Sequence, residues 1–225
     1  MNRPLVTLDE FVDPRHAALL VIDVQKDYCL ARLWGREVPA VQAMMPRLLR
    51  FMDVARQAGV TLIHLHNSHP DETNSPAWVG RKWTDKGPTP EYARPGTEGI
   101  EFMPGFEPRP GEFVVGKNRY SGFIATNLEL ILRSLGKQTI ICTGTATNNC
   151  VESTARHGYM LDFNLVLVSD GTASYDPALH EGTLTNIRNH FGKVATIDEI
   201  IACWRKAGHL PEREYEQAPG LLAGG

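Results

Sequence analysis

The amino-acid sequence predicts an α/β fold: a three-layer, doubly wound arrangement in which a mostly parallel sheet of six strands carries helices on both faces. Two observations predict it. Short continuous apolar runs, the pattern of strands buried on both faces, recur along the chain. Between them lie segments whose apolar residues repeat at helical spacing. Because the two kinds of segment alternate, parallel strands joined by crossover helices are the expected topology.

Six segments have the composition of buried strands. The first is the clearest, because the residues from Ala17 to Ile22 are all apolar and Asp23 follows directly. The preceding residues, 1–16, include Pro4 and Pro14 and are expected to form an extended lead-in. The predicted strands are 17–22, 60–66, 112–115, 139–142, 163–168 and 193–196.

Five helices are predicted between and after these strands. The longest, 38–58, has apolar residues at helical spacing, and Gly59 supplies the glycine that often follows a helix, although Pro46 lies inside it. Pro177 suits the first turn of a later helix. The predicted helices are 38–58, about 126–134, one that begins beside Cys150, 177–190 and 197–206.

Residues 67–111 form a long segment with little periodicity and many prolines and glycines. Loops of this length in a compact domain usually carry function. We therefore expect residues 1–225 to form a single domain, with loop 67–111 as an insertion that shapes the substrate pocket or contacts another subunit. The tail from Pro211 is expected to be loosely held or used between subunits. The loop's aromatic residues either wall a pocket or anchor the loop itself; they are Trp78, Trp83, Tyr92 and Phe102.

Composition argues against several classes of protein. The 225 residues are 42% hydrophobic and 22% charged with a net charge of −3, and no basic stripe suggests nucleic-acid binding. No apolar run approaches the roughly 18 residues of a membrane-spanning helix, and the N-terminus lacks the apolar core of a signal peptide. No CxxC pair occurs, so we expect a reducing, cytoplasmic location. No nucleotide-binding glycine motif is present, and no cofactor is predicted.

Asp23, Lys117 and Cys150 each follow a predicted strand. A parallel sheet brings such strand ends to one edge, so these side chains are expected to meet. A carboxylate can take the proton of a thiol, and an ammonium can hold both groups in place. Taken singly, each residue has a simpler interpretation: Asp23 as a helix cap or turn residue, Lys117 as a surface charge and Cys150 as a small core residue.

Cys150 is expected in the first turn of a helix. Asn149 is a good N-cap residue and stands three residues before Glu152, which resembles a capping box. Free backbone N–H groups and the helix dipole at this position favour a thiolate, and the sequence therefore predicts a lowered pKa for the Cys150 thiol. The same N–H groups can hold an oxyanion.

Three stretches of the sequence resemble the signatures of the isochorismatase-like cysteine hydrolases, namely 21–25 (VIDVQ), 117–123 (KNRYSGF) and 144–151 (GTATNNCV). The resemblance covers about residues 15–205 and implies the catalytic triad Asp23, Lys117 and Cys150. It also implies a non-proline cis peptide at Thr145–Ala146 and an oxyanion hole made by the N–H groups of Ala146 and Cys150.

The family includes nicotinamidases, which bind a metal through an Asp-x-His and a further His. In this chain Asn67 replaces that aspartate and Thr73 stands where the second histidine is expected, so no metal is predicted. His64, His66 and His69 nevertheless form a dense cluster, whose first two members can be hydrogen-bonded core residues on one face of a strand.

The segments around Arg119 and Cys150 resemble those of family members that act on ureido and carbamoyl groups. By that resemblance the substrate-binding residues are Asn67, Arg119, Tyr120 and Gln25. Asn67 and Tyr120 are expected to hydrogen-bond a polar substrate. Arg119 either pairs with a substrate carboxylate or is a structural arginine tied to loop carbonyls.

The predicted function is therefore a cysteine amidohydrolase that cleaves the C–N bond of a small ureide or carbamoyl compound through a thioester. The candidate substrates are biuret or triuret, ureidoacrylate-like acids and N-carbamoyl amino acids. The alternatives are an amidase for another amide such as nicotinamide, and a relative that binds without catalysis. The resemblance also implies a homo-oligomer, either a dimer or a tetramer.

Overall fold

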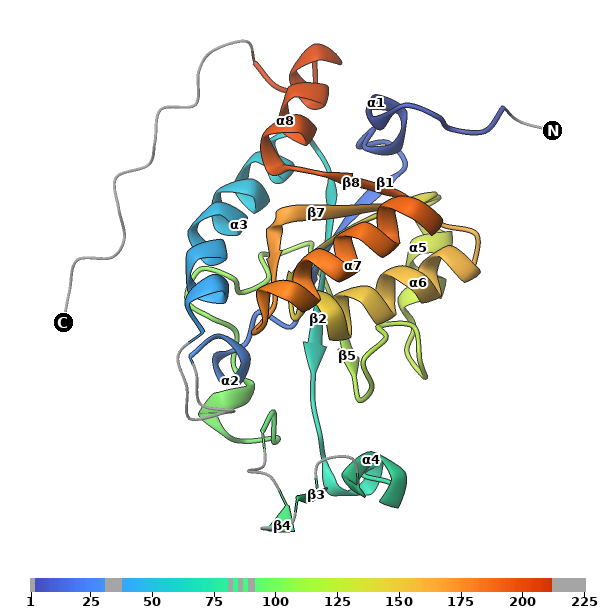
Figure 1. The fold of residues 1–225 in the computed structure, drawn as a ribbon. Coiled ribbons are helices and arrows are strands. Elements are labelled where there is room, and N and C mark those ends of the chain that lie inside the picture. Colours follow the sequence, from blue (N-terminus) through green and yellow to red (C-terminus); the bar gives the residue numbers. More distant parts are fainter. Residues whose placement is uncertain (1–2, 31–37, 81–82, 85–86, 89–91, 212–225) are drawn as a thin grey trace.

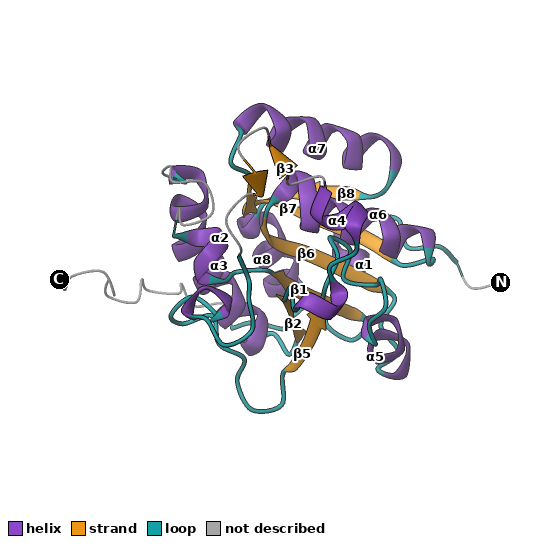
Figure 2. Ribbon diagram, turned by 90° about the horizontal axis from the view of Figure 1, so that it is seen from below, coloured by secondary structure: helices purple, strands orange, loops and turns teal. Residues whose placement is uncertain are grey.

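The computed structural model describes residues 3–30, 38–80, 83–84, 87–88 and 92–211, and shows one six-stranded sheet with helices on both faces (Figures 1 and 2). The strand order is β5-β2-β1-β6-β7-β8, and all five pairings are parallel. The predicted fold class is thus confirmed. The strands are β1 (Ala17–Ile22), β2 (Thr61–Asn67), β5 (Phe113–Lys117), β6 (Thr139–Thr145), β7 (Asn164–Ala173) and β8 (Lys193–Ala195).

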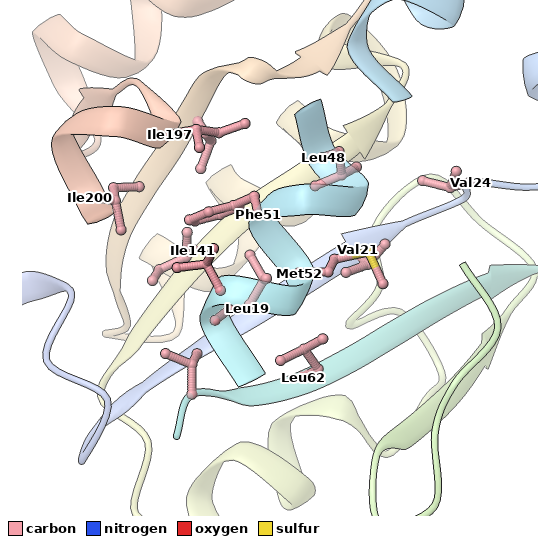
Figure 3. Packing of buried hydrophobic residues seen from close by; sticks show 14 of the residues in the cluster. Leu19, Val21, Val24, Leu48, Phe51, Met52, Leu62, Ile141, Ile197 and Ile200 are labelled. Carbon is pink, nitrogen blue, oxygen red and sulfur yellow. The ribbon is translucent and has the colours of Figure 1, made fainter. Parts of the chain in front are cut away.

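Successive residues of the buried strands pack against opposite helix layers. Leu19 and Val21 of β1 contact one core, which also contains residues of α1 (Leu8–Phe11), α3 (Pro39–Gln57) and α8 (Ile197–Lys206) (Figure 3). Leu20 and Ile22 point the other way, toward α5 (Leu128–Ser134), α6 (Glu152–Met160) and α7 (Pro177–His190). The alternation follows from the two-residue repeat of a strand, and the two cores fix the sheet between its helix layers.

The first core is closed by two aromatic side chains from distant parts of the chain. The rings of Phe51 in α3 and Trp204 in α8 stack with their centroids 5.4 Å apart, and both side chains are buried. The indole N–H of Trp204 donates to the carbonyl of Val12, 2.7 Å away. The C-terminal helix is therefore tied both to the long helix and to the lead-in before β1.

The lead-in contains a helix that the sequence analysis did not predict. Thr7 caps α1 by accepting from the N–H of Glu10, and the Glu10 carboxylate accepts from the N–H of Thr7. This reciprocal pair is a capping box, which holds even a one-turn helix. The pattern Thr-x-x-Glu is visible in the sequence, but the prolines on either side led to the prediction of an extended segment.

Segment 67–111 contains several short helices and strands. They are η1 (Asp71–Thr73), α4 (Pro76–Gly80), an antiparallel pair β3 (Trp83–Thr84) and β4 (Gly87–Pro88), and η2 (Glu98–Ile100). A short α2 (Lys26–Cys29) follows β1. Within the described ranges, none of the helices combines the length and apolarity needed to cross a membrane. The Trp83 side chain and the tail after Pro211 lie outside what the structure describes.

The strand register brings the ends of β1, β2, β5 and β6 to one edge. Ile22, the last residue of β1, is level with Leu65 of β2 and Gly144 of β6. On the outer side of β2, Asn67 is level with Lys117, the last residue of β5. Side chains at one level of a parallel pair project to the same side of the sheet, so this edge gathers the candidate residues.

Candidate active site

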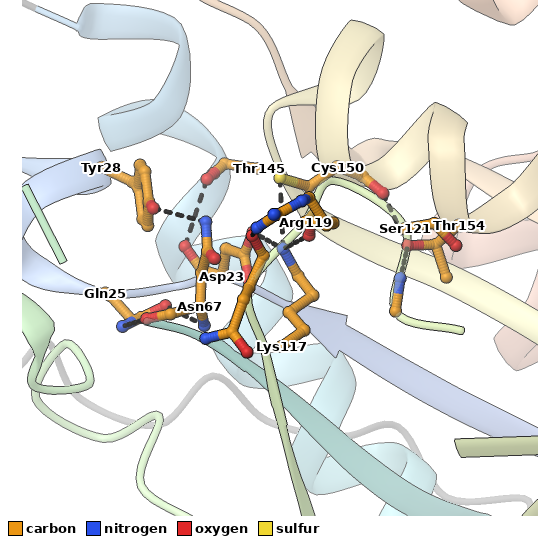
Figure 4. A network of polar contacts seen from close by, with 12 residues as sticks. Asp23, Gln25, Tyr28, Asn67, Lys117, Arg119, Ser121, Thr145, Cys150 and Thr154 are labelled. Carbon is orange, nitrogen blue, oxygen red and sulfur yellow. Dashed lines mark hydrogen bonds and ion pairs between the residues drawn. The ribbon is translucent and has the colours of Figure 1, made fainter. Parts of the chain in front are cut away.

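Asp23, Lys117 and Cys150 meet at this edge of the sheet, as predicted (Figure 4). The Lys117 Nζ lies 2.7 Å from Asp23 Oδ2 and 3.4 Å from Cys150 Sγ, and it donates to the carbonyl of Arg119 at 3.1 Å. These contacts account for the three N–H bonds of an ammonium group. The exposed fractions of Asp23, Lys117 and Cys150 are 1%, 0% and 5%, so the cluster is almost fully removed from water.

Asp23 is held between two strands at the point where β1 ends. Its backbone has a φ of 52°, in the left-handed region that side chains adopt only under constraint. Its N–H donates to the carbonyl of Leu65 at 3.0 Å, and its own carbonyl accepts from Thr145 Oγ1 at 3.2 Å. The neighbouring strands β2 and β6 therefore fix the direction of the carboxylate.

Cys150 lies in a wider turn than the predicted capped helix. Residues Thr147–Val151 form the π-helical turn η3, and α6 begins only at Glu152. The predicted capping box is wrong, because no side chain caps this turn and the Glu152 carboxylate instead accepts from Arg156 and Thr183, each at 2.7 Å. A π-turn of this kind occurs often at functional sites and here places the thiol beside Lys117.

Thr154 connects the turn that carries Cys150 to the loop that follows Lys117. Thr154 Oγ1 donates to the carbonyl of Cys150 at 2.7 Å and accepts from the N–H of Gly122 at 2.9 Å. Thr154 is completely buried. One hydroxyl group thus joins the segment of Cys150 to the segment that follows Lys117.

The predicted lowering of the Cys150 pKa is not what the structure gives. Burial raises the pKa of the Cys150 thiol, and the Asp23 carboxylate raises it further, while Lys117 acts in the opposite direction. These surroundings therefore favour the neutral thiol. Burial also raises the pKa of Asp23, against the lowering effect of Lys117. A carboxyl group with a raised pKa is a stronger base, which suits it to accept the proton of the thiol.

Lys117 keeps its positive charge despite being buried. Burial by itself would lower its pKa, but Asp23 and Cys150 outweigh that effect and the pKa is raised. The same ammonium lowers the cost of a negative charge on either neighbour. The site therefore holds one fixed cation between two groups that can exchange a proton.

Asn67 lies level with Lys117 and is fixed at both its backbone and its side chain. Gln25 Oε1 accepts from the Asn67 N–H at 2.8 Å, and Gln25 Nε2 donates to the carbonyls of Asn67 and Ile100 at 3.0 and 2.7 Å. Asn67 Nδ2 donates to the hydroxyl of Tyr28 at 2.6 Å, while its buried Oδ1 has no hydrogen-bond partner among the described residues. The Gln25 side chain is buried, and its carboxamide oxygen and nitrogen are both hydrogen-bonded to backbone groups. Gln25 therefore holds the backbone of Asn67 in place.

Arg119 is tied to loop carbonyls, which was one of its two predicted roles. Its guanidinium donates to the carbonyls of Asn118 at 2.7 Å and Thr73 at 3.0 Å, and lies 4.8 Å from the centroid of the Trp78 ring. The Trp78 ring in turn meets Tyr120 edge-on, with centroids 5.2 Å apart. Arg119 thus joins α4 and η1 to the segment after β5.

The three predicted histidines face different partners. His64 Nε2 is 2.8 Å from Glu112 Oε2, and His66 Nε2 is 2.9 Å from the carbonyl of Ile100. The ring of His69 lies between those of Trp78 and Tyr92. Across the described part of the chain, no three His, Cys, Asp or Glu residues are grouped as a metal site requires.

The remaining predicted feature is the turn that precedes Cys150. The Thr145–Ala146 peptide bond is cis, as the resemblance implies. Ala146 and Cys150 are both buried within this turn, and the carbonyl of Ala146 accepts from the N–H groups of Asn149 and Val151 at 3.0 and 3.3 Å. These backbone hydrogen bonds within the turn hold the main-chain atoms around Cys150 in place.

Some residues at this site carried no signal in the sequence. Tyr28 and Tyr175 lie close enough to Asp23 and Cys150 that these groups help to raise the pKa of both tyrosines, although burial is the larger cause. The hydroxyl of Tyr175 donates to the carbonyl of Tyr28 at 3.1 Å. Neither tyrosine belongs to a recognisable motif, and only the tertiary structure brings them to the triad.

Comparison with known proteins shows the family to which the chain belongs. A family model described as the isochorismatase domain matches residues 17–199. The chain is 32% identical over 205 residues to the ureidoacrylate amidohydrolase RutB of Caulobacter vibrioides, covering 82% of this chain and 89% of that protein. Among solved structures, a cysteine hydrolase from Pseudomonas syringae pv. phaseolicola is 26% identical with a TM-score of 0.78, covering 92% of this chain and all (100%) of the other.

A second solved structure, N-carbamoylsarcosine amidase from Thermoplasma acidophilum, is 26% identical with a TM-score of 0.66, covering 81% of this chain and 97% of the other. The domain match spans most of the chain and includes Asp23, Lys117 and Cys150 of the buried cluster described above. The chain therefore belongs to the isochorismatase family of hydrolases, as its sequence motifs predict.

Proposed function

We propose that this protein is a cysteine amidohydrolase that cleaves the C–N bond of a small ureido or carbamoyl compound through a thioester on Cys150. The observation that carries the proposal is the position of Lys117 Nζ, 2.7 Å from Asp23 Oδ2 and 3.4 Å from Cys150 Sγ in a buried cluster. An acid, a cation and a thiol at these distances form a nucleophile with its base. The names of the similar proteins, a ureidoacrylate amidohydrolase and an N-carbamoylsarcosine amidase, support amide substrates of this size.

In the first half of the reaction, the Asp23 carboxylate takes the proton of the Cys150 thiol as the sulfur attacks the substrate carbonyl carbon. The N–H groups of Ala146 and Cys150 stabilise the resulting oxyanion. The C–N bond then breaks, and protonated Asp23 gives its proton to the leaving ammonia or amine. Lys117 keeps its charge throughout and compensates the negative charge as it moves from the carboxylate to the sulfur and back.

In the second half, Asp23 takes a proton from a water molecule that attacks the thioester. The C–S bond breaks, the acid product leaves, and the sulfur recovers its proton from Asp23. Asn67 and Tyr120 are proposed to bind the polar part of the substrate. Arg119, which has further N–H groups beyond the two that bind carbonyls, is proposed to meet a substrate carboxylate, whereas Gln25 acts by holding Asn67.

An ammonia-release screen tests the reaction class. The panel is ureidoacrylate analogues, N-carbamoyl amino acids, biuret, triuret and nicotinamide. We expect release from at least one ureide, its loss in Cys150→Ala and in Asp23→Asn, and no requirement for an added metal. Full activity of Cys150→Ala on the compound that the native enzyme cleaves would remove the mechanism, and cleavage of nicotinamide alone would replace the proposed substrate class.

Thiol labelling tests the role of Asp23 without a substrate. The electrophile iodoacetamide carries the amide group that the site is proposed to bind, so we expect it to alkylate Cys150 faster than the more exposed Cys203. Asp23→Asn removes a carboxylate that raises the pKa of the Cys150 thiol, so labelling of Cys150 should become faster while that of Cys203 stays unchanged. Equal, slow labelling of both cysteines in the native protein would instead favour a relative that binds without catalysis.

Three further expectations stay predictions. They are a homo-oligomeric state, a cytoplasmic location, and a single domain in which segment 67–111 shapes the pocket. The last is supported by the contacts that this segment makes, because Thr73 and Trp78 both touch Arg119 and Ile100 accepts from Gln25.

A further inference from the structure

The Asn67 side-chain amide is hydrogen-bonded to the Tyr28 hydroxyl. Asn67 Nδ2 donates to the hydroxyl of Tyr28 at 2.6 Å, and the two side chains are 3% and 8% exposed. Asn67 Oδ1 is buried and has no hydrogen-bond partner within the part of the chain that the structure describes. A buried acceptor without a partner costs free energy, and a native site keeps one when a ligand supplies the missing donor.

Asn67 lies at the edge of the sheet where Asp23, Lys117 and Cys150 meet. Asn67 is level with Lys117 in the β2–β5 pairing, so the two side chains project from the same side of adjacent strands. Asp23 and Cys150 are near enough to Tyr28 to influence its pKa, and Figure 4 shows the Tyr28–Asn67 pair beside Asp23. This position suits Asn67 Oδ1 to meet part of the molecule that reacts at Cys150.

Tyr28 itself is held firmly. It belongs to the short helix α2, its ring meets that of Tyr92 edge-on with centroids 5.8 Å apart, and its carbonyl accepts from the Tyr175 hydroxyl at 3.1 Å. The backbone of Asn67 is fixed separately by Gln25. With both ends restrained, the only remaining freedom of Asn67 is rotation of its amide, which would exchange the oxygen and the nitrogen.

We propose that Tyr28 is a positioning residue: its hydroxyl holds the Asn67 amide with the oxygen toward the substrate, so that the site selects ligands that present an N–H group there. This inference rests on the proposed function, because a terminal ureido or carbamoyl group carries such N–H donors. A site built to accept an N–H discriminates strongly against ligands that lack it, since its buried acceptor would stay unpaired.

The first experiment is a double-mutant cycle on a ureide that the screen identifies. Tyr28→Phe removes only the hydroxyl, and we expect KM to rise about tenfold with little change in kcat, because the contact forms with bound substrate and transition state alike. Asn67→Ala should raise KM at least as much. In the Asn67→Ala background, Tyr28→Phe should have no further effect, because no amide is left to orient. Additive effects would overturn the proposal.

The control is Tyr159→Phe, which removes the same hydroxyl from a tyrosine of α6 that is 44% exposed and whose ring meets Phe191. Tyr175 is unsuitable as a control, because its hydroxyl donates to the carbonyl of Tyr28 and so helps to hold that residue. Tyr159→Phe should leave KM unchanged and should show no coupling with Asn67→Ala. Equal effects of the two Tyr→Phe variants would mean that Tyr28 acts only as packing, and would count against a specific role.

A second measurement needs no substrate and so separates this inference from the proposed function. In ¹⁵N NMR of the whole protein, the side-chain NH₂ signal of Asn67 is assigned by its loss in Asn67→Ala. We expect one of its protons to exchange slowly with water in the native protein and quickly in Tyr28→Phe, with Tyr159→Phe like the native protein. Unchanged exchange in Tyr28→Phe would overturn the proposal even if ureides are cleaved.

Discussion

Lys117 Nζ and Asp23 Oδ2 form a buried ion pair at 2.7 Å, and both side chains are at most 1% exposed. The two residues are 94 positions apart in the sequence and reach one another because β5 and β1 end at the same edge of the sheet. A charge in such a place is stable only with its partner. The pair therefore links the stability of the protein directly to its proposed chemistry.

Lys117→Met should destabilise the protein by about 3–5 kcal/mol at neutral pH, because it leaves the Asp23 carboxylate buried without a cation. Urea unfolding followed by circular dichroism measures this. The control is the double variant Lys117→Met with Asp23→Asn, which removes both charges and should recover most of the stability without any activity. If the double variant is no more stable than the single one, the loss comes from packing and not from the unpaired charge.

Cys150→Ser should lower kcat by at least about 10³-fold and leave the fold intact, because the hydroxyl is a far weaker nucleophile and Asp23 is placed for a thiol. Rapid quench with mass spectrometry should detect an acyl adduct on native Cys150 and none on the variant. Turnover by Cys150→Ser at a rate near that of the native enzyme would contradict nucleophilic catalysis at this position.

Stability should fall in acid through Glu112. Burial by itself would raise its pKa, but Arg56, the N–H of Arg109 and His64 together lower the pKa of Glu112 to about 2. Because the folded pKa lies below the unfolded value of 4.5, Glu112 binds fewer protons when folded, and its contribution is full above pH 4.5 and lost as the pH falls toward 2. Thermal unfolding between these pH values measures the slope.

The matched variant for that measurement is Glu112→Gln, which should be less stable than the native protein above pH 4.5 and should flatten the acid slope. Asp23 acts in the opposite sense: its pKa is raised by burial, so its contribution weakens as the pH rises from the unfolded value of 3.8 through the folded one. Asp23→Asn should remove that second dependence and keep the first. Identical pH profiles in all three proteins would contradict both assignments.

Gly144→Ala should destabilise the protein by about 3 kcal/mol or more, because it combines backbone strain with overpacking. Gly144 has a φ of 101°, and an added Cβ would lie 2.1 Å from the carbonyl oxygen of Ile22. Ile22 precedes Asp23, so the surviving protein should also lose activity. Gly116→Ala on β5 is the control, since its Cβ would meet nothing within 4 Å, and urea midpoints of the two variants should differ clearly.

The arrangement of the triad could be predicted because it depends on features that are local in the sequence. Buried strands are readable as apolar runs, and parallel topology then brings Asp23, Lys117 and Cys150 together whatever the details of the loops. The geometry at Cys150 could not be predicted in the same way. A capped helix and the π-turn differ by where a single turn of backbone hydrogen bonds begins, and the composition of residues 147–152 permits either.

The polar surroundings of the triad depend on contacts between distant segments. Gln25 is hydrogen-bonded to Asn67 and Ile100, which lie 42 and 75 positions further along the chain. The sequence therefore could not show that the Gln25 side-chain amide already has hydrogen-bond partners. The direction of the Cys150 pKa was predicted wrongly for the same reason. Its position in a turn favours the thiolate, but the depth of burial, which only packing determines, acts the other way and prevails.

The Lys117 ammonium comes from a strand at the edge of the sheet. Among the described strands, β5 pairs with β2 alone, and its other side is an edge of the sheet. Strands at a margin open more readily than central ones, so detachment of β5 would withdraw Lys117 while β1 and β6 still carry Asp23 and Cys150. Low concentrations of urea should therefore abolish hydrolytic activity before the helical circular dichroism signal falls. Hydrolysis would then report partial unfolding more sensitively than circular dichroism does.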